Sequence, residues 1–314
     1  MTKIIQHALV TGGAGFIGSH LVDALIEQGA RVTVIDNLTT GKMENLQDAG
    51  ARVHFVEGDI RNRGLLQQVM DGVDVVFHQA AVVSVPLSVA HPLDSAAVNE
   101  TGTLEVLEAA RQAGCRRVVL ASSSAVYGDD PELPKRETMA FGPLSPYAVQ
   151  KMTGEYYAGL YTKLYGLETA CLRYFNVFGP RQDPSSPYSG VISIFLDRAG
   201  AGRSPVIYGD GEQTRDFVYV RDVVSANVCA ATEDTAAGKA FNIGTGKTIT
   251  INRLWQQVAE LAGIALAPDY EAARHGDILH SVAAIDAARR DLGFSPEISF
   301  EEGLARTYAW YQRQ

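Results

Sequence analysis

The chain has 314 residues, of which 46% are hydrophobic and 20% are charged, as is typical of a soluble globular enzyme with a full core. A net charge of −9 argues against a protein that coats nucleic acid or an anionic membrane. Three scattered cysteines without a CxxC pair predict neither a disulfide framework nor a metal site. The sequence shows no signal segment and no long apolar run, so we expect a cytoplasmic protein that does not bind membranes.

Short β-branched runs alternate with longer amphipathic segments in the first half of the chain. The runs predict strands and the segments predict helices, in the order strand 4–10, helix 16–28, strands 31–35 and 52–56, helix 65–70, strand 73–77, helix 101–113, strand 117–121, helix 147–165 and strand 168–172. Such alternation predicts an α/β fold, with a doubly wound parallel sheet that is covered by helices on both faces.

The pattern changes near Asn176. Residues 180–190 are rich in Pro, Ser and Asp, and glycines at 209–211 and 244–246 mark further turns. We therefore predict a first domain over residues 1–175 and a smaller α/β domain over residues 176–314. The smaller domain is expected to lie against the carboxyl edge of the sheet and can interleave with the first.

Glycines are concentrated directly after the first predicted strand, in the segment TGGAGFIG from Thr11 to Gly18. Gly13, Gly15 and Gly18 have the spacing of the dinucleotide-binding fingerprint, and Gly12 completes a variant of it. Glycines let the backbone approach a pyrophosphate, whose charge then lies at a helix N-terminus. A plain tight turn would also collect glycine, but the strand–loop–helix context favours a cofactor loop.

Asp36 ends the second predicted strand, 18 residues after Gly18. A carboxylate there accepts hydrogen bonds from a ribose 2′-hydroxyl and repels a 2′-phosphate, and no basic residue follows until Lys42. The sequence therefore predicts NAD rather than NADP. Asp59 follows the third strand, where it can meet the adenine end of the cofactor or cap a helix; the two roles are not exclusive.

Tyr147 and Lys151 are four residues apart in a predicted helix, so their side chains lie on one face. An ammonium ~5 Å from a phenol, at an effective dielectric constant near 20, lowers the tyrosine pKa by about two units. We hypothesise that Tyr147 is the base that removes a proton from a substrate hydroxyl while hydride leaves the same carbon. Alone, the pair is a weak signal, because both residue types are common on helix surfaces.

Ser122, Ser123 and Ser124 end the fifth predicted strand, at the edge where open sheets bind ligands. A serine hydroxyl there can relay a proton or hydrogen-bond the reacting oxygen, or it can simply form a turn or a cap. We expect one of the three to be catalytic and the others to be structural or to face the cofactor.

Five features together are similar to a known family: TGGAGFIG, the aspartate at 36, SSSAVYG at 122–128, SPYAVQK at 145–151 and LRYFNVFGPR at 172–181. Over nearly its whole length the chain resembles the extended short-chain dehydrogenases/reductases that act on nucleotide sugars, and most of all the UDP-glucose and UDP-N-acetylglucosamine 4-epimerases. The resemblance implies a Rossmann-like sheet, a bound NAD, and inversion at C4 of a UDP-hexose through a transient 4-keto sugar.

The resemblance also assigns roles to residues. It implies Ser123 and Tyr147 as the catalytic acid–base groups and Lys151 as the residue that orients the nicotinamide ribose. Contacts with NAD are implied for Gly12, Gly15, Phe16, Ile17, Gly18, Asp36, Asn37, Gly41, Asp59, Ile60, Gln79, Ala80, Ala81, Val83, Asn99, Tyr147, Lys151 and Phe175. Contacts with the UDP-sugar are implied for Ser123, Ser124, Tyr147, Asn176, Val191, Tyr208, Gln213, Arg215, Arg274, Asp277 and Ser281. No metal is implied.

Related reactions are distinguished by the residues after the catalytic serine. Relatives that dehydrate or decarboxylate nucleotide sugars carry acidic residues where this chain has Ser124 and Ala125, so both reactions are disfavoured. A uronate epimerase stays open, since no single residue decides the charge at C6 of the substrate. A non-catalytic NAD-binding sensor would not need Ser123, Tyr147 and Lys151.

Ser281 follows the segment RHGDILH, at a position that lines the sugar pocket near C2 in the family. A tyrosine there often accompanies restriction to UDP-glucose, whereas a small residue leaves room for an acetamide. We therefore predict activity on UDP-GlcNAc/UDP-GalNAc as well as on UDP-Glc/UDP-Gal.

Two further points concern the helix of residues 147–165. Gln150 stands where many relatives have serine, which puts details around Lys151 in doubt but not its role. The family also implies a homodimer, joined by a four-helix interface of residues 101–113 and 147–165. The apolar stripes of these two helices fit core packing equally well.

Overall fold

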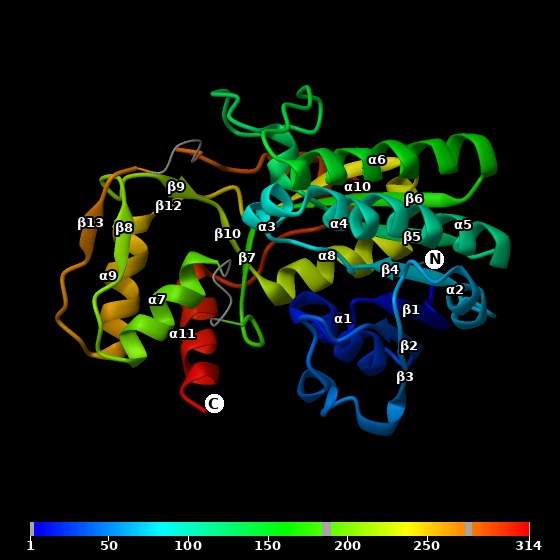
Figure 1. The fold of residues 1–314 in the computed structure, drawn as a ribbon, viewed down its shortest axis with the longest axis horizontal. Helices are drawn as coiled ribbons and strands as arrows, with labels where there is room; N and C mark the ends of the chain where they lie inside the picture. The colour runs from blue at the N-terminus through cyan, green and yellow to red at the C-terminus, as the bar shows by residue number, and fades with distance from the viewer. Residues whose placement is uncertain (1–2, 184–189, 274–277, 314) are drawn as a thin grey trace.

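The computed structural model describes residues 3–183, 190–273 and 278–313. The chain forms a larger lobe around a central sheet and a smaller lobe beside it, which lies at the left of Figure 1. Among the described residues, no helix is both long enough and apolar enough to cross a membrane.

Seven parallel strands form the central sheet, in the order β11-β6-β5-β4-β1-β2-β3. Successive residues of a strand pack into different clusters on the two faces, as Leu9 and Val10 do in β1. The inner strands are therefore apolar on both faces, as a buried parallel sheet requires. The predicted α/β fold is confirmed. The strand bounds are His7–Thr11 (β1), Arg31–Asp36 (β2), Val53–Glu57 (β3), Val75–His78 (β4), Arg117–Ser123 (β5), Glu168–Tyr174 (β6) and Lys239–Ile243 (β11).

The predicted strands are found, with changes at their ends. Strand β1 begins at His7 rather than at Ile4, whose side chain is exposed. Strands β5 and β6 both continue past their last predicted residues, where Ser122 and Ser123 pair with Arg173 and Tyr174. The predicted strands ended at the last apolar residue of each run. In the structure, backbone hydrogen bonds between β5 and β6 continue through the polar residues that follow.

Helices cover both faces of this sheet, and the predicted helices correspond to α1, α2, α5 and α6. One face is covered by α1 (Phe16–Glu27), α8 (Val220–Thr232) and α10 (Asp286–Leu292), and the other by α2 (Arg63–Val69), α5 (Thr103–Ala113) and α6 (Pro146–Tyr165). Between β4 and α5 lie α3 (Val85–Ala90), α4 (Pro92–Ala96) and a π-helical turn (Ala97–Gly102). Ser145 accepts a hydrogen bond from the Ala148 amide and fixes the start of α6.

The second half of the chain contributes to both lobes. Strand β11, α8 and α10 complete the central sheet and its helical layer, so the chain returns to the larger lobe after residue 176. The smaller lobe has a core that includes Phe178, Phe195, Trp255 and Leu304. Around this core lie β7 (Asn176–Phe178) paired with β10 (Phe217–Tyr219), β9 (Thr214–Arg215) with β12 (Ile249–Thr250), β8 (Val206–Tyr208) with β13 (Asp269–Glu271), and the helices α7 (Val191–Gly200), α9 (Ile251–Ala262) and α11 (Phe300–Tyr311).

Candidate active site

The glycine loop between β1 and α1 is packed too closely for side chains. Gly12 has φ +68°, and a Cβ there would lie 2.7 Å from the Ala80 amide nitrogen. A Cβ at Gly18 would lie 2.2 Å from the Gly12 carbonyl oxygen. Gly15 is the N-cap of α1 and no side chain caps that end, so Phe16 and Ile17 open a first turn whose backbone can receive an anion.

Asp36 is buried at the end of β2, and the backbone holds its carboxylate in place. Its Oδ2 accepts a hydrogen bond from the Ala14 amide at 3.0 Å, and its Oδ1 accepts one from the Leu38 amide at 2.9 Å. Burial raises the pKa of Asp36, and the two backbone hydrogen bonds lower it. Gly41 passes so close that a Cβ there would lie 2.8 Å from Oδ1. A bare helix end and a fixed carboxylate at the second strand are the groups that a dinucleotide needs, so these residues fit NAD.

Asp59 does not cap the following helix. The cap of α2 is Asn62, whose side chain accepts a hydrogen bond from the Leu65 amide. Asp59 instead accepts two hydrogen bonds from the Arg61 guanidinium, each 2.8 Å long, and one from Asn37. These interactions, above all the one with Arg61, lower the pKa of Asp59 to about 2. The neighbouring Ile60 is buried, against Gly102 of the π-helical turn.

The segment that follows β4 forms hydrogen bonds with β1, with β6 and with the π-helical turn. The Ala80 amide donates a hydrogen bond to Thr11 Oγ1, and Gln79 hydrogen-bonds with the Tyr174 hydroxyl. The side chain of Asn99 bonds both backbone groups of Val82 and also donates to Gln150 Oε1 at 2.7 Å. Buried Gln150 thereby anchors this segment to α6. Ala81 is half-buried and Val83 is exposed.

Tyr147 and Lys151 lie on one face of α6, as predicted, beside the carboxyl end of β5. Lys151 Nζ is 5.8 Å from the centroid of the Tyr147 ring and donates a hydrogen bond to the Ala121 carbonyl at 2.9 Å. Burial raises the pKa of Tyr147, and a hydrogen bond with Ser123 lowers it. Burial also lowers the pKa of Lys151 to about 8. The expected net lowering of the phenol pKa by the ammonium is not found in the protein alone. The sequence argument counted the charge of Lys151 and left out the desolvation of the phenol.

The three serines at the end of β5 have different partners. Ser122 donates a hydrogen bond to Glu155 on α6, so its hydroxyl is engaged in the interior. Ser123 accepts a hydrogen bond from the Ala125 amide and interacts with Tyr147. Ser124 is half-buried and opens a short 3-10 turn, Ser124–Tyr127. Ser123 is therefore the serine that the fold pairs with Tyr147.

Most of the predicted sugar-nucleotide residues that the structure describes belong to the smaller lobe or to its border. Phe175 is buried, its amide bonded to the Ile243 carbonyl, while the next residue, Asn176, is exposed at the start of β7. Val191 begins α7, with Gly190 as an N-cap that offers no side chain. Such an end suits a diphosphate only together with cationic side chains.

The loops from 208 to 215 and from 278 to 283 lie against each other. The Ser281 amide donates to the Thr214 carbonyl, and Arg215 Nη1 donates to the carbonyls of Thr214 and Leu279. Gln213 Nε2 reaches the Tyr208 carbonyl at 2.7 Å. Arg274 and Asp277, which the sequence also predicted here, lie outside the described residues.

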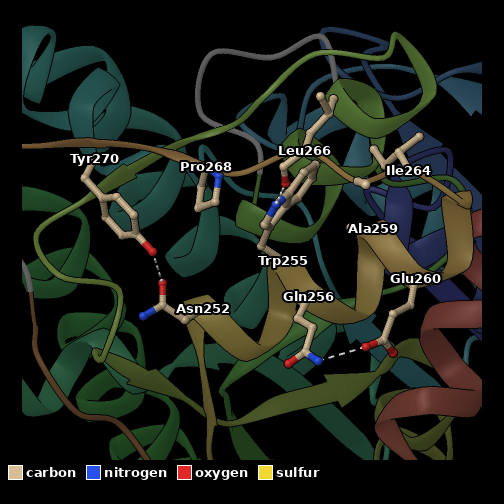
Figure 2. A pocket seen from close by; sticks show the side chains of 10 residues that line it. Asn252, Trp255, Gln256, Ala259, Glu260, Ile264, Leu266, Pro268 and Tyr270 are labelled. Carbon is tan, nitrogen blue, oxygen red and sulfur yellow. Dashed lines mark hydrogen bonds between the residues drawn. The ribbon is translucent and has the colours of Figure 1, made fainter.

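A separate hollow of about 400 Å³ lies on the outer side of α9 (Figure 2). Its described lining comes from α9 and residues 264–270 and includes none of the predicted site residues. Trp255 closes its floor with a hydrogen bond to the Leu266 carbonyl, and Tyr270 bonds Asn252 at its rim. Among the described residues, no three His, Cys, Asp or Glu side chains are grouped so that they could hold a metal ion.

Residues 8–244 match the model of a family described as the NAD dependent epimerase/dehydratase family. The chain belongs to this family. UDP-glucose 4-epimerase of Mycolicibacterium smegmatis is 41% identical over 315 residues, which are 98% of this chain and 99% of that protein. The solved structure of UDP-N-acetylglucosamine 4-epimerase from Methanobrevibacter ruminantium M1, in complex with UDP-N-acetylmuramic acid, is 43% identical, has a TM-score of 0.95, and matches 99% of this chain and 100% of that one. A UDP-N-acetyl-alpha-D-glucosaminuronate decarboxylase of Bacillus cytotoxicus is 33% identical over 318 residues, which are 98% of each chain.

Two charged residues beside Tyr147 and Lys151 had no predicted role in this member of the epimerase/dehydratase family. Glu155 and Arg173 form a buried ion pair between α6 and β6, with 2.7 Å between Glu155 Oε2 and the closer Arg173 nitrogen. The sequence carried a signal for both. Glu155 lies one helical turn after Lys151, and Arg173 is a charge inside an otherwise apolar strand.

Proposed function

We propose that the protein is a UDP-sugar 4-epimerase, an isomerase that inverts C4 of a UDP-hexose through a transient 4-keto sugar and uses tightly bound NAD. The observation that carries this proposal is the meeting of Ser123, Tyr147 and Lys151 at the carboxyl end of β5, at the same edge of the parallel sheet as the glycine loop that follows β1. Open α/β sheets bind ligands at this edge. An acid–base pair beside a dinucleotide site is the equipment for oxidising and reducing a secondary alcohol.

The residues divide the chemistry between them. Tyr147 takes the proton from the C4 hydroxyl, and Ser123 hydrogen-bonds the same oxygen while the charge on it changes. Bound NAD supplies the hydride acceptor at C4 and the hydride donor for the return. Lys151 holds positive charge beside the phenol and so favours its ionised form. Asn176, Tyr208, Gln213, Arg215 and Ser281 hold the UDP-sugar, with Arg274 and Asp277 and with the start of α7 at Val191. They hold the nucleotide firmly and leave the hexose free to turn its other face.

The turn after Ser123 lacks the acidic residue expected for dehydration or decarboxylation. No carboxylic acid follows Ser123 in the turn Ser124–Tyr127, and elimination or decarboxylation of the sugar has no acidic partner there. The decarboxylase relative keeps uronate chemistry as the second candidate, in which C6 would carry a carboxylate. A non-catalytic NAD sensor would gain nothing from burying Tyr147 beside Lys151, because burial of ionisable groups is costly.

We further propose that N-acetylated UDP-sugars are substrates together with the plain UDP-hexoses. Ser281 is half-buried and lies beside Thr214, next to Arg215. Its short side chain leaves space at the C2 position of a hexose. A bulky residue would fill that space.

The decisive experiment is to incubate the purified protein with UDP-Glc, UDP-GlcNAc, UDP-glucuronate and dTDP-glucose, without added NAD, and to separate the products by chromatography. We expect C4 epimers of the first two and no consumption of cofactor. Release of CO₂ or water from any of the four, or an obligatory equivalent of NAD consumed per turnover, would reject the proposal.

We also propose that the protein is a homodimer joined through α5 and α6. The outer side of α6 exposes Val149, Tyr156, Leu160 and Leu164, which recur at helical spacing, and apolar stripes of this kind mark interfaces. Light scattering should give a dimer mass for the wild type and a monomer mass for Leu164→Lys. The same change at the exposed Leu261 of α9 is the control and should leave the mass unchanged. A monomeric wild type would overturn this proposal.

A further inference from the structure

Three side chains of helix α6 contact three consecutive residues of strand β5. Tyr147, Lys151 and Glu155 follow one another at every fourth residue of α6. They meet Ser123, the Ala121 carbonyl and the Ser122 hydroxyl of β5, respectively. The first two of these contacts belong to the catalytic groups. The third belongs to Glu155, which does not reach the substrate edge.

Arg173 holds Glu155 from the next strand. Its Nε and Nη2 donate to the two carboxylate oxygens, at 2.9 Å and 2.7 Å. Both side chains are almost completely buried, with exposed fractions of 4% and 6%. Arg173 pairs with Ser122 in the sheet register and comes three residues before Asn176. The ion pair therefore links α6, β5 and β6 immediately behind the reacting groups.

The same cluster extends to the last strand of the sheet. Arg173 Nη1 donates to the Tyr127 hydroxyl at 2.8 Å, and that hydroxyl donates to Asn242 of β11 at 2.6 Å. The guanidinium also lies over the rings of Tyr127 and Phe141, about 5 Å from each centroid. Because this buried ion pair has many hydrogen-bond partners, its side chains are held in a single conformation. The ion pair therefore fixes the position of α6 relative to the strands that it contacts.

Glu155 is also the negative charge that Lys151 faces. The ionisable groups around Lys151 are Tyr147 and Glu155 on α6, Cys171 on β6 and His78 on β4. Burial raises the pKa of the Cys171 thiol and lowers that of His78 to about 3, so neither carries charge at neutral pH. Burial likewise raises the pKa of the Tyr147 phenol. Burial lowers the pKa of Lys151, and the carboxylate of Glu155 opposes that lowering.

We infer that Glu155 and Arg173 are positioning residues of the epimerase: their ion pair sets α6 against β5 so that Tyr147 meets Ser123, and it fixes the Glu155 carboxylate one helical turn after Lys151. The inference rests on the proposed function. It assigns a catalytic consequence to two side chains that touch neither the substrate nor the cofactor.

The test compares the pH dependence of kcat in variants that keep the fold. Glu155→Gln keeps the size of the side chain but removes the charge and one of the two acceptor oxygens that bond Ser122 and Arg173. We expect kcat to fall on the order of tenfold, because small displacements of reacting groups are costly. KM for the UDP-sugar should stay unchanged. The alkaline limb of the profile should move to lower pH by about one unit, because Lys151 loses its carboxylate neighbour. Glu155→Asp keeps the charge and should leave that limb in place.

A second variant separates positioning from stability. Glu155→Gln leaves a buried guanidinium without its partner, whereas Glu155→Gln combined with Arg173→Met leaves no buried charge and should restore the melting temperature. We expect the lower kcat and the shifted limb to persist in this double variant. The matched control is Glu105→Gln, which breaks the exposed pair with Arg63 and should change nothing.

The outcomes are distinct. Recovery of wild-type kcat and pH profile together with stability in the double variant would mean that the ion pair is only structural, and would overturn the inference. An unchanged profile in a folded Glu155→Gln variant would do the same. A wild type that epimerises no UDP-sugar would defeat the proposed function instead.

Discussion

The two lobes hold their candidate binding residues in different ways. In the larger lobe, Asp36 accepts two backbone hydrogen bonds and Lys151 donates one to the neighbouring strand. In the smaller lobe, the side chain of Asn176 is exposed and Arg215 lies on a strand of only two residues. A cofactor that is regenerated in every cycle needs a fixed site, whereas a hexose that must turn over needs room. We therefore expect the larger lobe to determine the chemistry and the smaller lobe to determine the substrate.

The largest effect is expected in the larger lobe, from Tyr147→Phe. Tyr147 is the phenol that hydrogen-bonds Ser123, and if it is the acid–base group as proposed, its loss should lower kcat by ~10²–10⁴-fold. Because the ring and its packing remain, the bound NAD and the KM for the UDP-sugar should hardly change. Steady-state epimerisation assays and the NAD content of the purified protein measure both quantities.

The matched control for this variant lies on the same helix. Tyr165→Phe removes the same hydroxyl from an exposed ring near the end of α6 and should leave kcat unaltered. If Tyr147→Phe kept near-normal turnover, the larger lobe would not hold the base, and the division between the lobes would fail.

A smaller effect is expected from Asp36→Asn, which tests whether the cofactor site is held by its backbone bonds. An amide has one acceptor oxygen, so either the Ala14 or the Leu38 amide loses its partner, and the negative charge that we expect to face the ribose is lost. Bonds to charged groups contribute ~1.5–3 kcal/mol, so NAD affinity should fall on the order of 10–100-fold.

The readout is the amount of NAD that stays with the purified protein, followed by titration of the stripped enzyme. Asp48→Asn makes the same chemical change in the same lobe, on a side chain with 83% of its surface exposed, and should keep its cofactor. Full retention of NAD by Asp36→Asn would show that the fixed carboxylate is not what binds the cofactor.

The sequence predicted the larger lobe far better than the smaller one, for physical reasons. Strands and helices of the sheet repeat with regular periods, and the glycine loop has a backbone geometry that few sequences satisfy. Strand β11 was not predicted, because five residues after a long excursion carry no pattern that shows which sheet they join. The partners of Glu155 and of Gln79 were also missed, since contacts between side chains far apart in the chain leave no local signal.

The prediction that tests the smaller lobe is Ser281→Tyr. Added bulk beside C2 of the hexose should lower kcat/KM for UDP-GlcNAc on the order of tenfold, as overpacking typically costs ~1–3 kcal/mol. Turnover of UDP-Glc should be spared, because it has only a hydroxyl at that carbon. Ser281→Ala, which keeps the space, is the control. Equal losses on both sugars would mean that Ser281 supports the whole site rather than its selectivity.

The smallest effect concerns stability, and it distinguishes a histidine inside the larger lobe from one between the lobes. His78 is enclosed by Thr11 and Thr103, and burial lowers its pKa to about 3. His20 hydrogen-bonds the Pro180 carbonyl across the lobe boundary, and burial lowers its pKa to about 4. In the unfolded chain both titrate near 6.5. Below that pH the unfolded state binds more protons, so the free energy of unfolding falls as the pH falls.

For each histidine, the free energy of unfolding should fall by up to ~1.4 kcal/mol per pH unit once the pH is well below 6.5. Between about pH 7 and about pH 5.5 the fall should total about 1 kcal/mol for each histidine. Urea unfolding of His20→Gln over this range should show a smaller loss than that of the wild type, because the contribution of His20 is removed while those of His78 and of His7, whose pKa burial also lowers, remain. His91→Gln, an exposed histidine, should follow the wild type. If His20→Gln also followed the wild type, the boundary between the lobes would admit enough water to protonate His20 freely. The smaller lobe would then be attached more loosely than the hydrogen bond between His20 and the Pro180 carbonyl indicates. Movement between the lobes would in that case provide the space that the hexose needs in order to turn.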